Sequence, residues 1–382
     1  MTNKADVVII GGGIIGLATA FYLTKAKYGK VILLEKEALF GTGATAKAAG
    51  GIRAQFTTKE NIEMSMLSEK LFCSFKNDTG HDALFDKVGY MFLVKENKDA
   101  DIFQKSYDLQ KSLGLNVQKL QPDEIAQYAP HVSTENVQFA TFCQDDGLGD
   151  PHEFLSGYEK ASRAAGLEIA FNTEVIGIEQ SSGKIKSVKT SKGNIDTPMV
   201  INCAGPFAKK IGAMVGADIK VEPIRRQIVT TGELSFVEPY FPMVVDVSTG
   251  LYCHKESKGM LLGWADKNVA PSFDISVDPE YTDNILERAL ELIPQLEEAE
   301  IGNQWAGLYE VTPDHRAIIG FEPSVEGMFY LTGFSGHGFM HAPAAGLITT
   351  EILTGQKPSV EISEFAPDRF KNGHLTVETN VI

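Results

Sequence analysis

The chain has 382 residues, of which 43% are hydrophobic and 22% charged, a composition typical of a globular protein with two or three structural units. Its 50 acidic and 35 basic residues give a formal net charge of −15. This charge argues against a general nucleic-acid binder, because neutralising phosphates requires a basic surface. It leaves room for a small anionic substrate, since a buried pocket can carry its own local charge.

Cysteine usage narrows the chemistry further. Cys73, Cys143, Cys203 and Cys253 are far apart and form no CxxC pair, so we expect no disulfide scaffold, no dithiol redox centre and no metal site. A reducing, cytoplasmic compartment fits this pattern. The apolar run Val7–Leu23 is interrupted by four glycines and follows an acidic residue, which favours neither a secretion signal nor a membrane span.

The first elements read as strand, turn, helix and strand. The β-branched run Ala5–Ile10 predicts a strand buried on both faces. Ile14–Tyr28 has a helical composition without proline, and Lys30–Glu35 predicts a second buried strand. Further along, amphipathic helices are predicted over 60–78 and 99–113, strands over 89–94, 137–143, 199–202, 222–231 and 250–254, a hairpin over 174–190, a helix over 281–293, and a final strand and helix over 329–332 and 339–353.

Signals typical of dinucleotide binding occur near both ends of the chain and around 170–205, while strands typical of an antiparallel sheet lie between them. We therefore predict an α/β fold with a discontinuous Rossmann-like cofactor domain and an inserted α+β substrate domain built on a mainly antiparallel sheet. The predicted boundaries are 1–84, 143–221 and 318–382 for the cofactor domain, and 85–142 and 222–317 for the substrate domain.

A GxGxxG pattern runs from Gly11 to Gly16, between the first strand and the first helix. Its first glycine permits a tight turn, the second of the pattern lets a pyrophosphate approach the backbone, and the last lets the helix pack on the strand. The first amides of the helix would face the phosphates, and an acidic residue at the end of the second strand can bind a ribose hydroxyl. The residues expected at this dinucleotide site, for FAD or NAD, are Gly11, Gly13, Ile14, Ile15, Gly16, Glu35 and Lys36.

Three later segments, GGIR at 50–53, YEVTPDH at 309–315 and GFSGHGFMHAPAAG at 333–346, resemble the D-amino-acid oxidase superfamily of FAD-dependent oxidoreductases. The resemblance extends from Asp6 to about Phe370 and is strongest to the branch of the sarcosine oxidase β-subunit and the L-proline dehydrogenase β-subunit. It implies FAD as the cofactor. The further FAD contacts that it implies are Gly43, Thr45, Gly51, Ile52, Val175, Ala204, Gly205, Phe334, Gly336, His337, Gly338, Phe339 and Met340.

The resemblance also has limits at the flavin. A relative in this superfamily holds its flavin through a cysteine just before the YxxTPD segment, but Gly307 lies in the corresponding region here, so we expect non-covalent FAD. Met340 and Tyr309 stand where relatives carry a lysine and an arginine that bind the substrate carboxylate. The glycine-rich turn before the last helix would stabilise negative charge on the reduced flavin through helix amides.

Three residues are predicted to act on the substrate. Arg53 would lie against the flavin, where a guanidinium can hold a carboxylate through two parallel hydrogen bonds. Tyr252 matches a pocket tyrosine of relatives, and His337 is a candidate for orienting or polarising the reacting group.

The function implied is FAD-dependent oxidation of the CH–NH bond of a small amino acid, a secondary amine such as sarcosine or proline, by hydride transfer to flavin N5. Two alternatives stay open, a 2-hydroxy-acid or glycerol-phosphate dehydrogenase and a flavin-carrying subunit of a heteromeric complex. The electron acceptor, and whether the chain pairs with a partner subunit or with itself, are also open. No nucleic-acid partner is expected.

Overall fold

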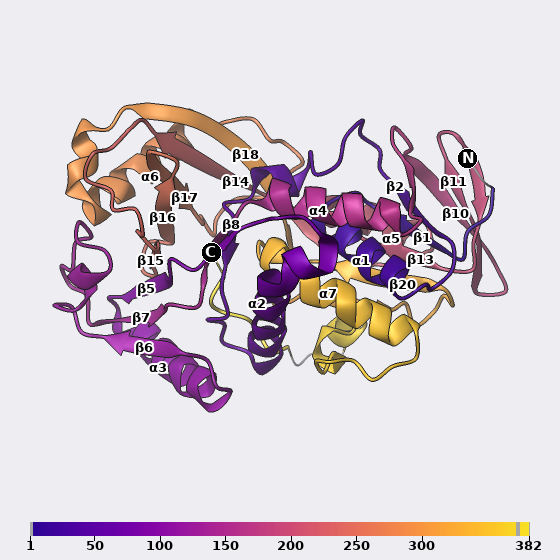
Figure 1. The fold of residues 1–382 in the computed structure, drawn as a ribbon, viewed down its shortest axis with the longest axis horizontal. Helices are drawn as coiled ribbons and strands as arrows, with labels where there is room; N and C mark the ends of the chain where they lie inside the picture. The colour runs from indigo at the N-terminus through magenta and orange to yellow at the C-terminus, as the bar shows by residue number, and fades with distance from the viewer. Residues whose placement is uncertain (1–2, 372–374, 382) are drawn as a thin grey trace.

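The computed structural model describes residues 3–371 and 375–381, and two large sheets dominate it (Figure 1). The first is six-stranded, with the order β19-β20-β13-β1-β2-β9, and is parallel except for β19. Its strands are β1 (Val7–Ile10), β2 (Val31–Leu34), β9 (Glu168–Ala170), β13 (Val200–Asn202), β19 (Ile318–Phe321) and β20 (Met328–Thr332).

Alternate residues of each strand point to opposite sides of this sheet. Because the residues on both sides are apolar, both faces must be covered. In β1, Val7 and Ile9 pack into one apolar cluster while Val8 and Ile10 pack into another. The first cluster includes α1 (Ile14–Lys25), α2 (Lys59–Thr79), α4 (Pro151–Ala164) and α7 (Gly338–Leu353), and the second includes β10 (Val175–Ser181), β11 (Lys184–Thr190), β12 (Gly193–Asp196) and α5 (Ala208–Ala213). The predicted Rossmann-like architecture is confirmed.

The second sheet is eight-stranded, with the order β18-β14-β17-β16-β15-β5-β7-β6, and only the β15–β5 pair is parallel. Helix α6 (Pro279–Leu292) packs on one face over β14, β16 and β17, and its Tyr281 and Ile285 share an apolar cluster with Val229, Leu251 and Leu262 of those strands. The strands are β5 (Tyr90–Val94), β6 (Val117–Leu120), β7 (Phe139–Cys143), β14 (Glu222–Thr231), β15 (Met243–Asp246), β16 (Leu251–Glu256), β17 (Gly259–Trp264) and β18 (Ile301–Val311). The predicted mainly antiparallel sheet is thus present.

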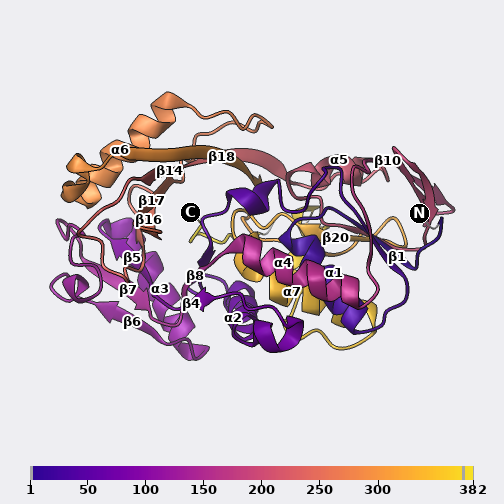
Figure 2. The ribbon, with the colours of Figure 1, turned by 45° about the horizontal axis from the view of Figure 1, so that its top comes forward.

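Strands β14 and β18 form a long band that connects the two parts of the molecule (Figures 1 and 2). They pair from Glu222 opposite Val311 to Thr231 opposite Ile301. β18 also contacts two short helices of the first part, η1 (Ala44–Lys47) and η3 (Gly205–Phe207).

Two further sheets have three strands each. One has the order β10-β11-β12, and the other pairs β8 (Gly147–Gly149) with β3 (Gly51–Ile52) and β4 (Phe85–Asp86). We propose the two large sheets as the centres of the two predicted domains, with the sheet of β3, β8 and β4 at the boundary between them. The remaining helices are α3 (Asn97–Ser112), η2 (Ile125–Gln127), η4 (Pro294–Glu298), η5 (Ser363–Phe365) and η6 (Arg369–Lys371).

Most predicted elements are present with ends shifted by a few residues. Helices α4 and α5 were not predicted, and neither were several strands, including β6, β9, β12, β15, β17, β18 and β19. Helix α4 begins with an N-cap aspartate, Asp150, whose side chain accepts a hydrogen bond from the backbone N–H of His152 at 2.8 Å, and Pro151 follows at the first helical position. Across residues 3–371 and 375–381, no helix combines the length and apolar character needed to cross a membrane.

Candidate active site

A cavity of about 600 Å³ takes side chains from both large sheets, a volume within the usual range for ligand sites. Its walls include the first glycine turn, the end of β2, the loop 41–51, the start of η3, β14, β16, β18 and the turn before α7. The site therefore lies at the carboxyl ends of the parallel strands, where open α/β sheets bind their ligands.

At the first turn, three glycines have different neighbours. Gly11 has φ +112°, and a Cβ there would lie 2.4 Å from the carbonyl oxygen of Cys203. A Cβ on Gly16 would lie 2.0 Å from the oxygen of Gly11. A Cβ on Gly13 would approach only the Thr45 hydroxyl, at 3.3 Å, and Gly13 lines the cavity. Gly11 and Gly16 are needed because the backbone packs closely at these positions, whereas Gly13 leaves the space that a pyrophosphate would fill.

Glu35 is held in place beside this turn. One carboxylate oxygen accepts a hydrogen bond from the backbone N–H of Gly12 and the other from that of Glu37, each at 2.8 Å. A carboxylate can accept about four hydrogen bonds, so Glu35 retains capacity for the hydroxyls of a ribose. The hydroxyl of Thr45 accepts a hydrogen bond from the N–H of Ile14 at 3.1 Å. This bond gives the first backbone N–H of α1 an acceptor.

Most of the predicted cofactor residues meet at this cavity, and three do not line it. Gly16 lies at the helix–strand contact, while Ile52 and Phe334 are buried in the core with 1% and 0% exposure. The predicted residues that line the cavity are Gly11, Gly13, Ile14, Ile15, Glu35, Lys36, Gly43, Thr45, Gly51, Val175, Ala204, Gly205, Gly336, His337, Gly338, Phe339 and Met340.

The other end of the cavity is formed by the turn before α7, which is held by Tyr309 and Glu310. Gly336 has φ +98°, and a Cβ there would lie 2.3 Å from the ring of Tyr309. The carboxyl of Glu310 accepts from the hydroxyl of Thr332 at 2.6 Å and from the N–H of Phe334 at 3.3 Å. Burial raises the pKa of Glu310. Sequence analysis did not single out Glu310, although it lies within the YEVTPDH segment.

These features fit FAD. A glycine cradle and a carboxylate stand at one end, and the first turn of α7 provides backbone amides at the other, as a dinucleotide with an anionic reduced ring requires.

We call one part of the cavity the substrate end, because the substrate is predicted to bind there; it is lined by Arg53, Tyr90, Arg226, Tyr252, Tyr309 and His337. Arg53 is buried, with 2% exposure. Its two terminal nitrogens donate to the carbonyl oxygens of Gln55 at 2.6 Å and Asn380 at 2.5 Å. The guanidinium carbon lies 3.9 Å from the centre of the Phe56 ring. Burial lowers the pKa of Arg53. Sequence analysis assigned this side chain to a substrate carboxylate, and the structure adds two backbone partners.

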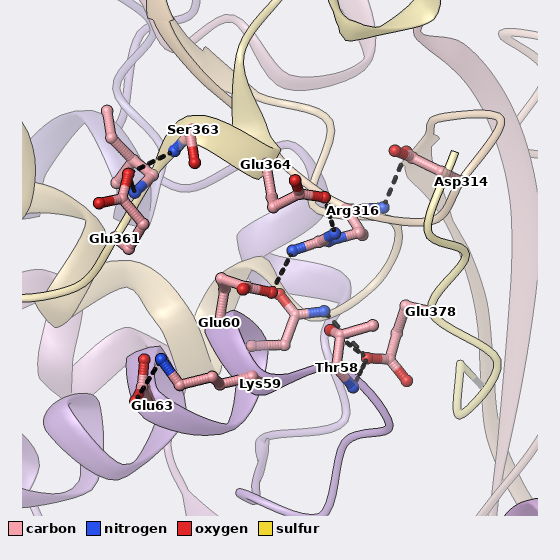
Figure 3. A network of polar contacts seen from close by, with 12 residues as sticks. Thr58, Lys59, Glu60, Glu63, Asp314, Arg316, Glu361, Ser363, Glu364 and Glu378 are labelled. Carbon is pink, nitrogen blue, oxygen red and sulfur yellow. Dashed lines mark hydrogen bonds and ion pairs between the residues drawn. The ribbon is translucent and has the colours of Figure 1, made fainter. Parts of the chain in front are cut away.

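The carbonyl of Asn380 belongs to segment 375–381, which is anchored on α2. Glu378 accepts from the hydroxyls of Thr57 and Thr58 at 2.6 and 2.9 Å and from the side-chain amide of Asn61 at 3.1 Å, as Figure 3 shows in part. It also accepts from the backbone N–H groups of both threonines. A carboxylate at a helix N-terminus is favoured by these amides and by the helix dipole.

A buried carboxyl pair supports the backbone beside Arg53. Asp146 accepts from the N–H of Ala54 at 3.0 Å and from the side-chain amide of Gln55 at 2.9 Å, and Glu69 of α2 contacts it. Burial together with the neighbouring carboxylate raises the pKa of Glu69 to about 10. The pair therefore retains a proton at neutral pH.

Three phenols line the substrate end: Tyr90, Tyr252 and Tyr309. Burial raises the pKa of each, that of Tyr90 to about 12. All three are therefore neutral at physiological pH and can donate hydrogen bonds to an anion. Sequence analysis identified Tyr252 and noted Tyr309, but it missed Tyr90.

His337 also lines this end and is 3% exposed. Burial lowers its pKa well below the ordinary value, so the imidazole is neutral. Among the described residues, neither ring nitrogen has a hydrogen-bond partner. A neutral imidazole without partners is available to a bound cofactor or substrate.

Arg226, on β14, is the second guanidinium at the cavity wall, and sequence analysis missed it. No motif marks the residue, because it reaches the site through the pairing of distant strands.

The glycine cradle, Glu35 and the turn before α7 line one cavity, an arrangement typical of a flavoprotein oxidoreductase. The comparison with protein families agrees: the chain matches the DAO family, FAD dependent oxidoreductase, over residues 6–352, and it belongs to this family. The predicted family and cofactor are confirmed.

Solved structures and curated proteins give more detail. The structure of L-proline dehydrogenase from P. horikoshii is 30% identical, with a TM-score of 0.92 over 98% of this chain and all of that one. Glycine oxidase from Geobacillus kaustophilus is 26% identical by structure, with a TM-score of 0.86 over 96% of this chain and 99% of that one. Sarcosine dehydrogenase of Mus musculus is 26% identical over all of this chain, which spans 43% of that protein.

Proposed function

We propose that this chain oxidises the CH–NH bond of a small amino acid, with a secondary amine of the sarcosine or proline type as substrate. The observation that carries this proposal is the substrate end of the cavity, where two guanidinium groups and three neutral phenols lie beside the turn before α7. A cation with neighbouring hydroxyl donors suits a carboxylate. The relatives named for proline, glycine and sarcosine support the same substrate class.

FAD, when bound, would accept the hydride that leaves the carbon bearing the nitrogen. The residues of the chain position the substrate: a cation holds the carboxylate, phenols hydrogen-bond to it, and the apolar side chains of Ile228 and Met243 line the space beside it. Burial of the site excludes water, which strengthens these contacts. The organic product is an imine, which water hydrolyses after release.

Oxidation of a 2-hydroxy acid is the second candidate, and His337 favours it. An alcohol must lose its hydroxyl proton to a base, and a neutral imidazole with two free nitrogens can accept one. If this reading holds, His337→Gln removes activity toward hydroxy acids, and the panel below separates the two substrate classes.

Further proposals concern the state of the protein. FAD is held non-covalently, since a side chain at Gly307 would come within 2.6 Å of Lys47 and glycine offers no thiol. We also propose a cytoplasmic location, and activity either alone or beside a partner subunit.

The direct test is to purify the chain alone and measure dye reduction with matched amino acids, hydroxy acids and simple amines. We expect turnover with sarcosine or proline, and FAD in the supernatant after acid precipitation. Flavin that stays in the precipitate would contradict non-covalent binding. Flavin that no substrate reduces would favour a carrier subunit.

A further inference from the structure

Arg226 enters the cavity because of its place in β14. Its neighbours in the strand, Arg225 and Gln227, contact the start of α6 through Asp278 and Thr282. Side chains alternate along a strand, so Arg226 points to the opposite face together with Ile228. Both line the cavity.

The charge of Arg226 has no counter-ion within the described part of the chain. One terminal nitrogen donates to the carbonyl oxygen of Arg225 at 3.0 Å, and the Nε atom is buried without a partner. A buried donor without an acceptor is costly, and a partly buried cation favours an anion beside it.

Arg53 also has a buried Nε atom without a partner among the described residues, but its two terminal nitrogens are more committed than those of Arg226. Both of its terminal nitrogens already donate to backbone carbonyls, and its flat face stacks on Phe56. Moving it to meet a substrate would break a contact with Asn380 or Gln55. Of the two arginines, Arg226 offers more uncommitted donors.

The neighbours of Arg226 suit a carboxylate. Its guanidinium carbon lies 5.4 Å from the centre of the Tyr309 ring, and Tyr309 hydrogen-bonds with Tyr252. Each phenol carries an O–H donor. One carboxylate could therefore receive hydrogen bonds from the guanidinium and from a phenol.

We propose that Arg226, with Tyr252 and Tyr309, binds the carboxylate of the substrate, and that Arg53 is a positioning residue that fixes the wall of the site to segment 375–381. This inference rests on the proposed function in its choice of an amino acid as substrate. It assigns the anion site to β14, β16 and β18.

The test compares the holoenzyme with Arg226→Ala, Arg226→Lys and Arg53→Ala, and uses Arg225→Ala, on the opposite face of β14, as the matched control. The substrates are proline and its decarboxylated analogue pyrrolidine, and sarcosine with dimethylamine. A second measurement needs no turnover: tetrahydro-2-furoate is titrated while the flavin absorption band is followed, which gives a dissociation constant.

In Arg226→Ala, we expect the preference for the acid over the amine, and the affinity for tetrahydro-2-furoate, to fall on the order of 10- to 100-fold. Arg226→Lys should recover only part of the loss, because a point charge does not reproduce the fork of a guanidinium. Arg53→Ala should lower kcat/KM for the acid and the amine alike, so that the acid preference itself is kept, and Arg225→Ala should change neither value. Flavin content and melting curves show whether each variant folds, and Arg226→Gln replaces Arg226→Ala if the latter does not.

Loss of the acid preference in Arg53→Ala with its retention in the Arg226 variants would overturn the assignment. Wild-type protein that does not bind tetrahydro-2-furoate would also overturn it. If the furoate binds through Arg226 but no amino acid reduces the flavin, the anion site stands and the proposed function fails.

Discussion

The two ends of the cavity are built in different ways. The nucleotide end uses backbone and small residues from a short stretch of sequence, above all Gly11–Ile15. The substrate end uses large side chains from segments far apart, including Arg53, Tyr90 and Arg226. A cofactor shared by many enzymes needs a fixed backbone shape, whereas a particular substrate needs particular side chains. Specificity in this molecule therefore lies in the eight-stranded sheet and the loop that carries Arg53.

Gly13→Val should have the largest effect, and only on the nucleotide end. The valine would extend into the cavity, because a Cβ on Gly13 meets nothing closer than the Thr45 hydroxyl at 3.3 Å. We expect a folded protein that loses most of its flavin, with an affinity more than about tenfold lower. Flavin absorbance per protein measures this, and Gly177→Val in β10 is the control. A full flavin complement in Gly13→Val would contradict the assignment of the first glycine turn to the nucleotide end.

Glu378→Ala should affect the substrate end. The substitution leaves the amides of Thr57 and Thr58 and the side chain of Asn61 without their acceptor, which costs on the order of 1–3 kcal/mol of stability. It also loosens the segment that binds Arg53. We expect a lower melting temperature and a raised KM with nearly normal flavin content. Glu326→Ala, which removes only an exposed ion pair with Lys184, should change neither. An unaltered KM would show that segment 375–381 does not shape the site.

Tyr252→Phe should give a smaller loss, confined to substrate binding. Removing one phenolic donor costs about 0.5–1.5 kcal/mol, which corresponds to roughly a two- to tenfold lower kcat/KM for an amino acid. The amine analogue should be oxidised as before. Tyr240→Phe, at a residue that is 78% exposed, serves as the control. Equal losses for acid and amine would mean that the phenol does not contact the carboxylate.

Glu69→Gln should have the mildest effect, visible in the pH dependence of stability. The folded state holds the proton of Glu69 up to about pH 10, whereas the ordinary pKa of the unfolded chain is 4.5. The folded state therefore binds more protons between these values, and stability falls as the pH rises through this window. The variant should flatten that decline in melting temperature, because a glutamine at this position carries no proton to lose. Melting curves at pH 6 and pH 9 would show it, and parallel curves for both proteins would contradict it.

The same difference explains what could be predicted from sequence. The first turn and Glu35 were identified because their spacing along the chain reproduces their geometry in space. Helix α4 was missed even though Asp150 and Pro151 form a strong start signal, so a closer reading would have found it. Arg226 and Tyr90 could not be found in this way. They meet only after β14 and β5 join one sheet, and no local pattern encodes that pairing.

The band formed by β14 and β18 has a consequence for motion. Nearly all of its residues are paired across the ladder, and such a ladder opens cooperatively rather than at one residue. The amides of this band that donate across the ladder should therefore exchange with solvent together rather than one by one. Because the band joins the two sheets, a hinge between them would have to lie elsewhere, and substrate entry should depend on loops and side chains around the cavity.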